Sequence, residues 1–171
     1  MPVTIIVAAP LLLWYDKDRF FQDYFDVVKH IPAAATDPKE NRFLKEILKR
    51  RGAGELMSAA CINDICRLSG GVLRDVMELA QSAAQYAYRD AEDRISKQHI
   101  EAAAKQLGNR YLAGIGAKEK RRIDHLLGHK KFDVHSPGSR ELLVGRQVLE
   151  YSSGGRDYFR VHPALVEVLL K

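Results

Sequence analysis

The stretch that decides the fold is Ser69-Gly70-Gly71-Val72-Leu73-Arg74-Asp75, which leads directly into the apolar-periodic run Val76-Met77-Glu78-Leu79-Ala80. Two glycines before a helical stretch allow the backbone to turn sharply and to approach a neighbouring group closely. The apolar spacing beyond them predicts a helix over about 72–90. Arg74, one turn into this helix, carries a planar and permanently charged guanidinium that suits phosphate oxygens. Gly70, Gly71 and Arg74 therefore form a candidate anion site. The alternative is an ordinary helix start with a solvated arginine.

The chain has 171 residues, enough for one ordinary domain or two small ones, and a net charge of +5. Much of this excess falls on six cations in one short segment: Lys118, Lys120, Arg121, Arg122, Lys130 and Lys131. Such a balance permits nucleic acid or acidic partners without requiring them. The cluster is therefore interpreted either as a solvated helix face or as a contact surface for nucleic acid or a protein partner.

The cysteines and the N-terminal segment bear on the compartment. Cys61 and Cys66 stand five residues apart in a helical pattern, which matches no disulfide framework and favours a reducing cytoplasm. The apolar segment from Val3 to Tyr15 lacks a basic leader, is interrupted by Pro10, and is too short to span a bilayer. We therefore expect a soluble cytoplasmic protein with no membrane partner.

The run from Val3 to Ala9 is rich in β-branched residues, shows no polar alternation and ends at Pro10. It predicts a strand buried on both faces, of the kind found inside a parallel sheet. No other segment of the first 130 residues predicts a strand that could flank it. We therefore expect residues 1–35 to be the remnant of a larger α/β core.

Residues 36–113 are expected to form a four-helix bundle. The expected helices span about 37–51, 55–68, 72–90 and 97–107. Asp37 suits the N-cap of the first helix and Pro38 its first position, while Ser96 suits the N-cap of the last. Short connections between such helices are typical of a bundle.

Residues 114–171 are expected to form a smaller α+β unit. Its expected elements are a basic helix at about 118–127, a short amphipathic piece at 140–143, strands at 147–151 and 157–161, and a last helix at 163–170. The two strands alternate around Gly154-Gly155, which predicts a β-hairpin. Helix, helix and hairpin in this order resemble a winged-helix domain with its wing at Gly154-Gly155.

The segment from Ser69 to Asp75 resembles the sensor-2 helix of AAA+ and related P-loop ATPases, in which a lid arginine reaches the terminal phosphate of the nucleotide. Neighbouring segments follow the order of that family. Val3–Ala9 is similar to the sensor-1 strand, although alanines stand where the family often has a polar residue. The helix ending at Arg50-Arg51 is similar to the first lid helix, and Ile95–Ala103 to the closing one. A winged helix after the lid is the arrangement of origin-recognition-type initiators and STAND signalling ATPases.

The resemblance covers nearly the whole chain and implies the C-terminal half of such an ATPase: mainly α, with a four-helix lid, a small α+β winged helix and a remnant of the α/β P-loop core. It implies that Arg74, with Gly70 and Gly71, contacts the nucleotide. It also makes Arg50 and Arg51 candidates for a phosphate or interface contact.

Two motifs of an active P-loop ATPase are absent from the sequence. There is no G-x-x-x-x-G-K-[ST] segment to cradle phosphates and no acidic Walker B strand end to hold Mg²⁺. We therefore expect ATP and Mg²⁺ to bind only with the missing core, and the chain alone to be inactive. The expected partner is that core or a neighbouring copy of the chain in a homo-oligomer.

The expected winged helix does not by itself indicate which kind of partner it binds. Beyond the basic cluster, its candidate contacts to nucleic acid or protein are Arg140, Arg146 and Arg156. Nearby acidic residues offset much of their charge, so both DNA and a protein remain candidate partners. The alternative function is a stand-alone winged-helix DNA-binding regulator, with the helices as a dimerisation or sensing unit.

Other constellations predict no metal or catalytic site. His125 and His129 have a helical ligand spacing, but no glutamate lies between them and no third ligand is near in sequence. The segment Asp133–Ser139 contains Asp, His and Ser without a nucleophile elbow. His162 stands where a strand gives way to a helix, and we expect it to pack or cap there.

Overall fold

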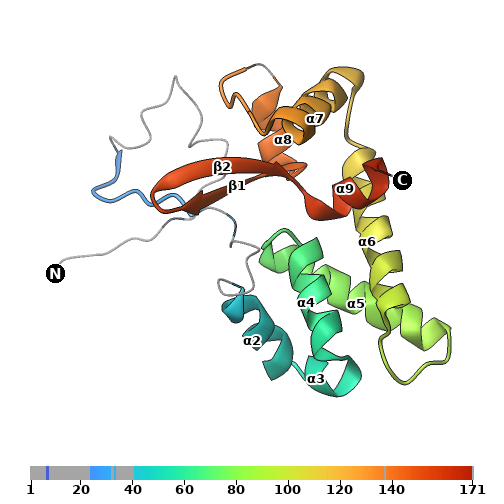
Figure 1. The fold of residues 1–171 in the computed structure, drawn as a ribbon. Helices are drawn as coiled ribbons and strands as arrows, with labels where there is room; N and C mark the ends of the chain where they lie inside the picture. The colour runs from blue at the N-terminus through green and yellow to red at the C-terminus, as the bar shows by residue number, and fades with distance from the viewer. Residues whose placement is uncertain (1–6, 8–23, 32, 34–40, 137, 171) are drawn as a thin grey trace.

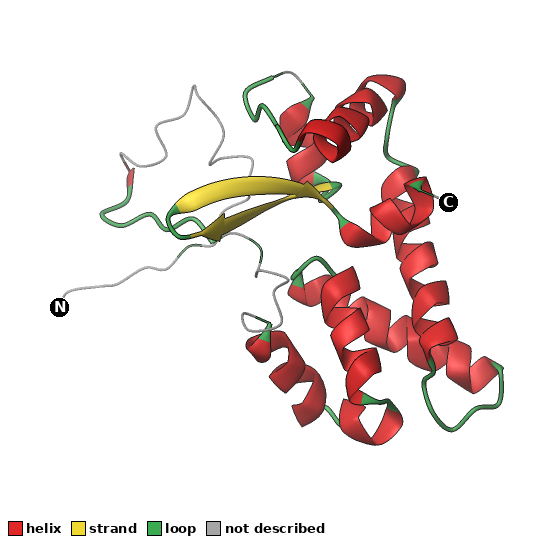
Figure 2. Ribbon diagram, viewed as in Figure 1, coloured by secondary structure: helices red, strands yellow, loops and turns green. Residues whose placement is uncertain are grey.

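The computed structural model describes residues 7, 24–31, 33, 41–136 and 138–170. Within these residues the protein is mainly helical, with a two-stranded antiparallel sheet near the C-terminus (Figure 1 and Figure 2). Its elements are α2 (Arg42–Arg50), α3 (Ala53–Leu56), α4 (Ala59–Leu68), α5 (Leu73–Arg89), α6 (Lys97–Leu112), α7 (Ala117–His129), α8 (Ser139–Val144), β1 (Val148–Ser153), β2 (Arg156–Val161) and α9 (Pro163–Leu169). The predicted mainly helical fold with a C-terminal hairpin is confirmed.

The single helix predicted over about 55–68 is wrong, because the segment forms α3 and α4 with a break at Met57. The backbone of Met57 is extended and bridges in parallel to Ile95. Ser58 then caps α4, and its side chain accepts a hydrogen bond from the Cys61 amide at 3.2 Å. A serine cap supplies the acceptor that the first turn of a new helix needs. The break therefore combines a local serine cap with a contact to a distant residue, and periodicity alone reveals neither.

Two other helix ends differ from the expected bounds. Helix α6 continues past Leu107 to Leu112, through Gly108. Its start is as predicted, since Ser96 and His99 form a reciprocal capping box in which the Ser96 amide donates to His99 Nδ1 at 3.1 Å. Helix α2 begins at Arg42, and the predicted cap at Asp37 lies outside the described residues.

Helix α9 packs against α6, so that the C-terminal end of the chain returns to the helical bundle (Figure 1). A Cβ added at Gly108 would lie 2.2 Å from the Ala164 carbonyl oxygen and 2.6 Å from Val168 Cγ2. Glycine therefore permits an approach that a side chain would block. One hydrophobic cluster runs from Leu44 to Leu165 and crosses the expected boundary at residues 113/114.

The β1–β2 hairpin turns at Gly154-Gly155 as predicted, with both glycines at positive φ. Its two faces have different neighbours. Tyr151 pairs with Tyr158 and stacks on it, and the Tyr151 hydroxyl reaches the helical bundle. On the opposite face Phe159 meets Phe132, with ring centroids 5.2 Å apart. The hairpin therefore packs between the helical bundle on one face and the α7–α8 segment on the other (Figure 2).

Of the expected core remnant at residues 1–35, the structure describes only 7, 24–31 and 33. The predicted strand Val3–Ala9 lies, apart from Val7, outside the described residues. The Ala33 amide donates to the Glu150 carbonyl at 3.0 Å, which joins this part of the chain to β1. None of the described helices combines the length and the apolar character needed to cross a membrane.

Candidate functional site

The turn at Gly70 and Gly71 is buried against the C-terminal unit. Both glycines adopt positive φ (62° and 81°), a conformation that side chains disfavour. The Gly70 carbonyl accepts a hydrogen bond from the Tyr151 hydroxyl at 2.7 Å. A Cβ at Gly70 would lie 2.3 Å from Leu149 Cδ1 and 3.0 Å from Pro163 Cδ. The close approach expected from the sequence is therefore made, within the described residues, to β1 and the start of α9.

The side chain of Arg74 lies on the surface, in the first turn of α5. No residue that the structure describes makes a hydrogen bond or ion pair with its guanidinium. The turn before it is fixed by Ser69, whose hydroxyl donates to the Cys66 carbonyl at 2.8 Å and accepts from the Gly71 amide at 3.2 Å. An exposed cation therefore stands on a rigidly held helix start.

The neighbouring residue, Asp75, is fully buried (0 % exposed) and joins four segments of the chain. The Tyr111 hydroxyl donates to Asp75 Oδ2 at 2.6 Å, and His162 Nε2 lies 3.1 Å from the same oxygen. Arg146 Nη1 lies 3.4 Å from Oδ1. Because His162 Nδ1 accepts from the Ala164 amide, the ring proton lies on Nε2 and points to Asp75. We call Asp75, Tyr111, Arg146 and His162 the Asp75 cluster.

Electrostatics keep Asp75 ionised. Burial raises the pKa of its carboxyl, but hydrogen bonds from His162 and Tyr111 and the charge of Arg146 lower it by more, so that the pKa lies below its ordinary value. Burial and the adjacent carboxylate raise the pKa of Tyr111, which keeps its hydroxyl as a donor. A buried carboxylate surrounded by donors stays charged and serves the structure. Losing any one of its partners would leave part of that charge uncompensated in the interior.

Two members of the Asp75 cluster, Arg146 and His162, were given other roles by the sequence analysis. Arg146, a candidate external contact, turns its guanidinium toward Asp75 and has 34 % of its side chain exposed. It does so from a backbone φ of 59°, which is uncommon for a residue with a side chain. His162 caps α9 as expected, and it also binds Asp75.

Sequence reasoning missed Asp75 itself, although a signal was present. Asp75 follows Val72 by three residues and precedes Leu79 by four, so that it occupies the apolar stripe of its helix. An acidic residue at such a position must be paired inside the protein. The sequence could have identified a buried charge, but not its partners.

The remaining candidate residues lie elsewhere. Arg50 pairs with Glu46 at 3.1 Å on the exposed side of α2, and Arg51 follows it, exposed. Lys118, Lys120 and Lys130 are exposed along α7 and at its end. Arg140 is half-buried in α8, and Arg156 is exposed at the tip of the hairpin.

The other three cations of the basic cluster, Arg121, Arg122 and Lys131, line one cavity of about 390 Å³. His125 joins them there, its ring stacked on that of His129 at 4.5 Å. The described residues contain no group of three His, Cys, Asp or Glu side chains placed to hold a metal ion.

Comparisons of the chain with protein-family models, curated proteins and solved structures found no match.

Proposed function

We propose that this chain is the lid and winged-helix portion of a P-loop ATPase of the AAA+ or STAND type, and that it transmits the nucleotide state to a DNA or protein partner. The order of elements supports this proposal: a helical bundle of α2–α6 precedes α7, α8, the hairpin and α9, as in the resemblance described above. Arg74 is the residue that contacts the terminal phosphate. ATP and Mg²⁺, when bound to the core, supply the phosphate that Arg74 reads.

One observation carries the proposal, namely the contrast between Arg74 and Asp75. Arg74 presents an exposed guanidinium, and the adjacent residue is locked to Arg146 and His162 of the C-terminal unit. Arg74 is free to reach an anion, since no described residue holds it. Its helix cannot rotate without disturbing the buried contacts of Asp75.

This arrangement couples two sites through one rigid helix start. A phosphate contact that draws Arg74 toward the nucleotide displaces the first turn of α5, which also carries Asp75. The buried ion pair and hydrogen bonds of Asp75 then favour one placement of α9 and the hairpin over another. Couplings of this kind are worth about 1–3 kcal/mol.

The test is nucleotide affinity, measured with the chain and its ATPase core together. Replacing Arg74 with Gln should weaken binding of a non-hydrolysable ATP analogue about tenfold, because a charge-assisted hydrogen bond is lost. Binding of ADP, which lacks the terminal phosphate, should change little. Arg94→Gln removes the same charge from an exposed site in the α5–α6 connection and serves as the control. Equal ATP affinity in the two variants would overturn the assignment of Arg74.

A stand-alone DNA-binding regulator is the second candidate, and the basic cavity beside α7 favours it. This function requires DNA binding that is unaffected by nucleotide and by Arg74→Gln. The proposed relay requires instead that ATP changes the affinity for the partner and that Arg74→Gln abolishes the change. Partner binding measured with and without ATP therefore separates the two functions.

A further inference from the structure

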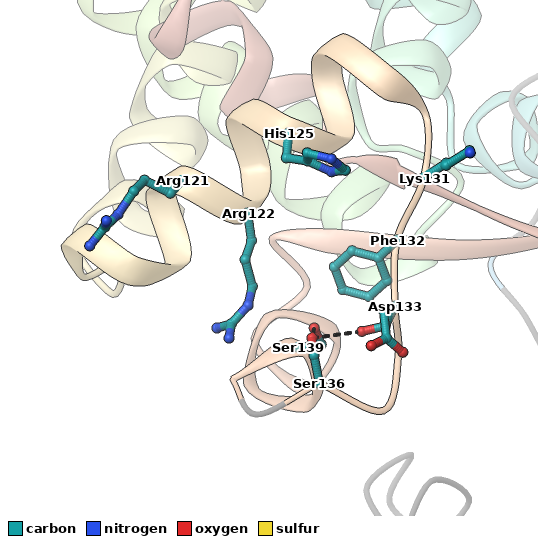
Figure 3. Close-up of a pocket in the computed structure, with 8 residues that line it drawn as sticks. All are labelled: Arg121, Arg122, His125, Lys131, Phe132, Asp133, Ser136 and Ser139. Carbon is teal, nitrogen blue, oxygen red and sulfur yellow. Dashed lines mark hydrogen bonds between the residues drawn. The ribbon is translucent and has the colours of Figure 1, made fainter.

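The cavity beside α7 has a strongly one-sided charge. Its lining contains Arg121, Arg122, Lys131 and His125 from α7 and its C-terminal end, and Phe132, Asp133, Ser136 and Ser139 from the connection to α8. Figure 3 shows Arg122 extending toward the two serines, with His125 above the phenyl ring, while Arg121 and Lys131 stand at opposite sides of the opening. We call this cavity the basic pocket.

The carboxylate in the pocket lining, that of Asp133, forms no ion pair with these cations among the described residues. Asp133 Oδ1 accepts a hydrogen bond from the His135 amide at 2.9 Å, and the Asp133 carbonyl accepts from the Ser136 hydroxyl at 2.9 Å. The Ser136 and Ser139 oxygens lie 2.6 Å apart. Asp133 therefore holds the loop together, and the loop forms a fixed wall of the pocket.

Arg122 is partly buried and lies near one carboxylate. Its side chain is 30 % exposed and lies 3.9 Å from Glu119, one turn earlier in α7. Its guanidinium also lies over Gly138, where a Cβ would come within 2.3 Å of Nη1. Glycine at this position makes room for the guanidinium beside the start of α8. A pre-positioned planar fork is suited to the two free oxygens of a phosphodiester.

Phe132 gives the basic pocket an apolar wall. Its ring packs on Phe159 of β2 and is half-buried, so that it is supported from behind. A cavity of about 390 Å³ exceeds what one phosphate needs and leaves room for the attached sugar. The pocket therefore combines cations with a hydrocarbon face, and these match the phosphate and the deoxyribose of a nucleic-acid strand.

We infer that the basic pocket binds a backbone phosphate of double-stranded DNA. Arg122 and His125 contact the phosphate oxygens, and Phe132 contacts the adjoining sugar. Lys118 is exposed outside the pocket and precedes Arg122 by four residues, so it shares that face of α7 and is placed for a neighbouring phosphate of the same strand. Such contacts position the protein on DNA without reading its sequence. This inference deepens the proposed function by naming the partner, and it rests on that proposal only for the link to nucleotide.

The hairpin is not part of this site. Successive side chains of a strand point to opposite faces. Phe159 of β2 packs on Phe132 and so marks the face toward the pocket. Arg156 and Arg160 are an odd number of residues from Phe159, so they lie on the opposite face. Arg160 instead covers the ring of Tyr158, at 5.2 Å from its centroid. Arg160→Gln is therefore a matched control, because it removes one positive charge from the same unit and leaves the pocket intact.

The experiment measures binding of the full chain to a fluorescent duplex DNA by anisotropy, over a series of salt concentrations. Arg122→Gln keeps most of the side-chain stem and should weaken binding about tenfold. It should also lower the slope of log affinity against log salt by about 0.9, the value for one phosphate contact. His125→Ala provides a second variant, and circular dichroism verifies the fold of each. Two unrelated duplex sequences should give the same losses.

Three results would overturn the inference. One is the absence of DNA binding by the wild-type chain, and another is an equal loss in Arg122→Gln and Arg160→Gln, which would indicate only general surface charge. The third is binding of inorganic phosphate or of an acidic peptide at this site without binding of DNA. None of these results bears on the ATP affinity of the Arg74 variant, so the pocket and the nucleotide contact can fail separately.

Discussion

Asp75 shows how a single buried charge depends on its surroundings. Its carboxylate is fully buried and is held by three side chains: Tyr111 of α6, Arg146 just before β1, and His162 at the start of α9. Removing the charge leaves Arg146 and His162 without the acceptor around which they are arranged. Loss of a buried partner is among the most destabilising of single changes.

Asp75→Asn should therefore lower the free energy of unfolding by about 3 kcal/mol near neutral pH. The pKa of Asp75 is lower in the folded protein than in the unfolded chain, where it is about 3.9. Its stabilisation is therefore complete above that pH and is lost as the pH falls through the lower, folded value. The difference between wild type and variant should shrink below about pH 4. Urea unfolding followed by circular dichroism over a pH series measures it.

Glu78→Gln is the control for this prediction. Glu78 lies one turn further along α5 and forms a two-bond ion pair with Arg110 at the surface. A solvent-exposed pair of this kind should contribute less than about 1 kcal/mol. If the two variants destabilised the protein equally, the description of Asp75 as the centre of a buried cluster would be wrong.

At the scale of elements, the α6–α9 contact explains why α6 does not end at its glycine. Glycine often marks the end of a helix, and the sequence predicted an end at Leu107. In the structure Gly108 instead lies directly against the Ala164 backbone, with no room for a Cβ. The residue serves packing between helices, which a reading of one helix at a time does not reveal.

Gly108→Ala should accordingly destabilise the protein by about 2 kcal/mol, the cost of forcing a methyl group into a filled contact. Gly128→Ala in α7 introduces the same methyl group where nothing lies within 4 Å. Here alanine's higher helix propensity should stabilise the protein by up to about 1 kcal/mol. Thermal unfolding of both variants provides the comparison, and opposite signs are required. Stabilisation by both would show that α9 does not pack on α6.

At the scale of the whole molecule, the bundle and the C-terminal unit share their core. Leu165 of α9 is completely buried, and it belongs to the same hydrophobic cluster as Leu44 of α2. The Asp75 cluster and the Tyr151–Gly70 hydrogen bond also join the helical bundle to the C-terminal unit. Two units joined in this way should unfold together.

Leu165→Ala should thus lower the opening free energy of amides in α4 and α5 as much as in α9, by about 2–5 kcal/mol. Hydrogen exchange of the individual helices, followed by mass spectrometry, measures this. Leu170→Ala changes a largely exposed leucine just after α9 and should leave exchange unaltered. Earlier exchange of the hairpin and α9, with the bundle unaffected by Leu165→Ala, would mean that the two units are independent.

The elements of this protein were largely predictable from local sequence. Apolar periodicity predicted α5, Ser96 predicted the start of α6, and Gly154-Gly155 predicted the hairpin turn, because each depends on residues within one or two turns of chain. The break at Met57 was not predicted, since it depends on a bridge to Ile95. The basic residues of α7 were identified, but not which of them share a cavity.

The sequence by itself determined most of the helical segments, where the hairpin turns, and that an arginine follows the Gly70-Gly71 turn. Only the tertiary structure decided what surrounds that arginine. The partners of Asp75 are 36, 71 and 87 residues away along the chain, and no local pattern relates them. A charge buried at the start of α5 must find donors wherever the fold brings them. The physical reason is that helices and turns follow from local preferences, whereas a buried polar contact follows from the packing of distant segments.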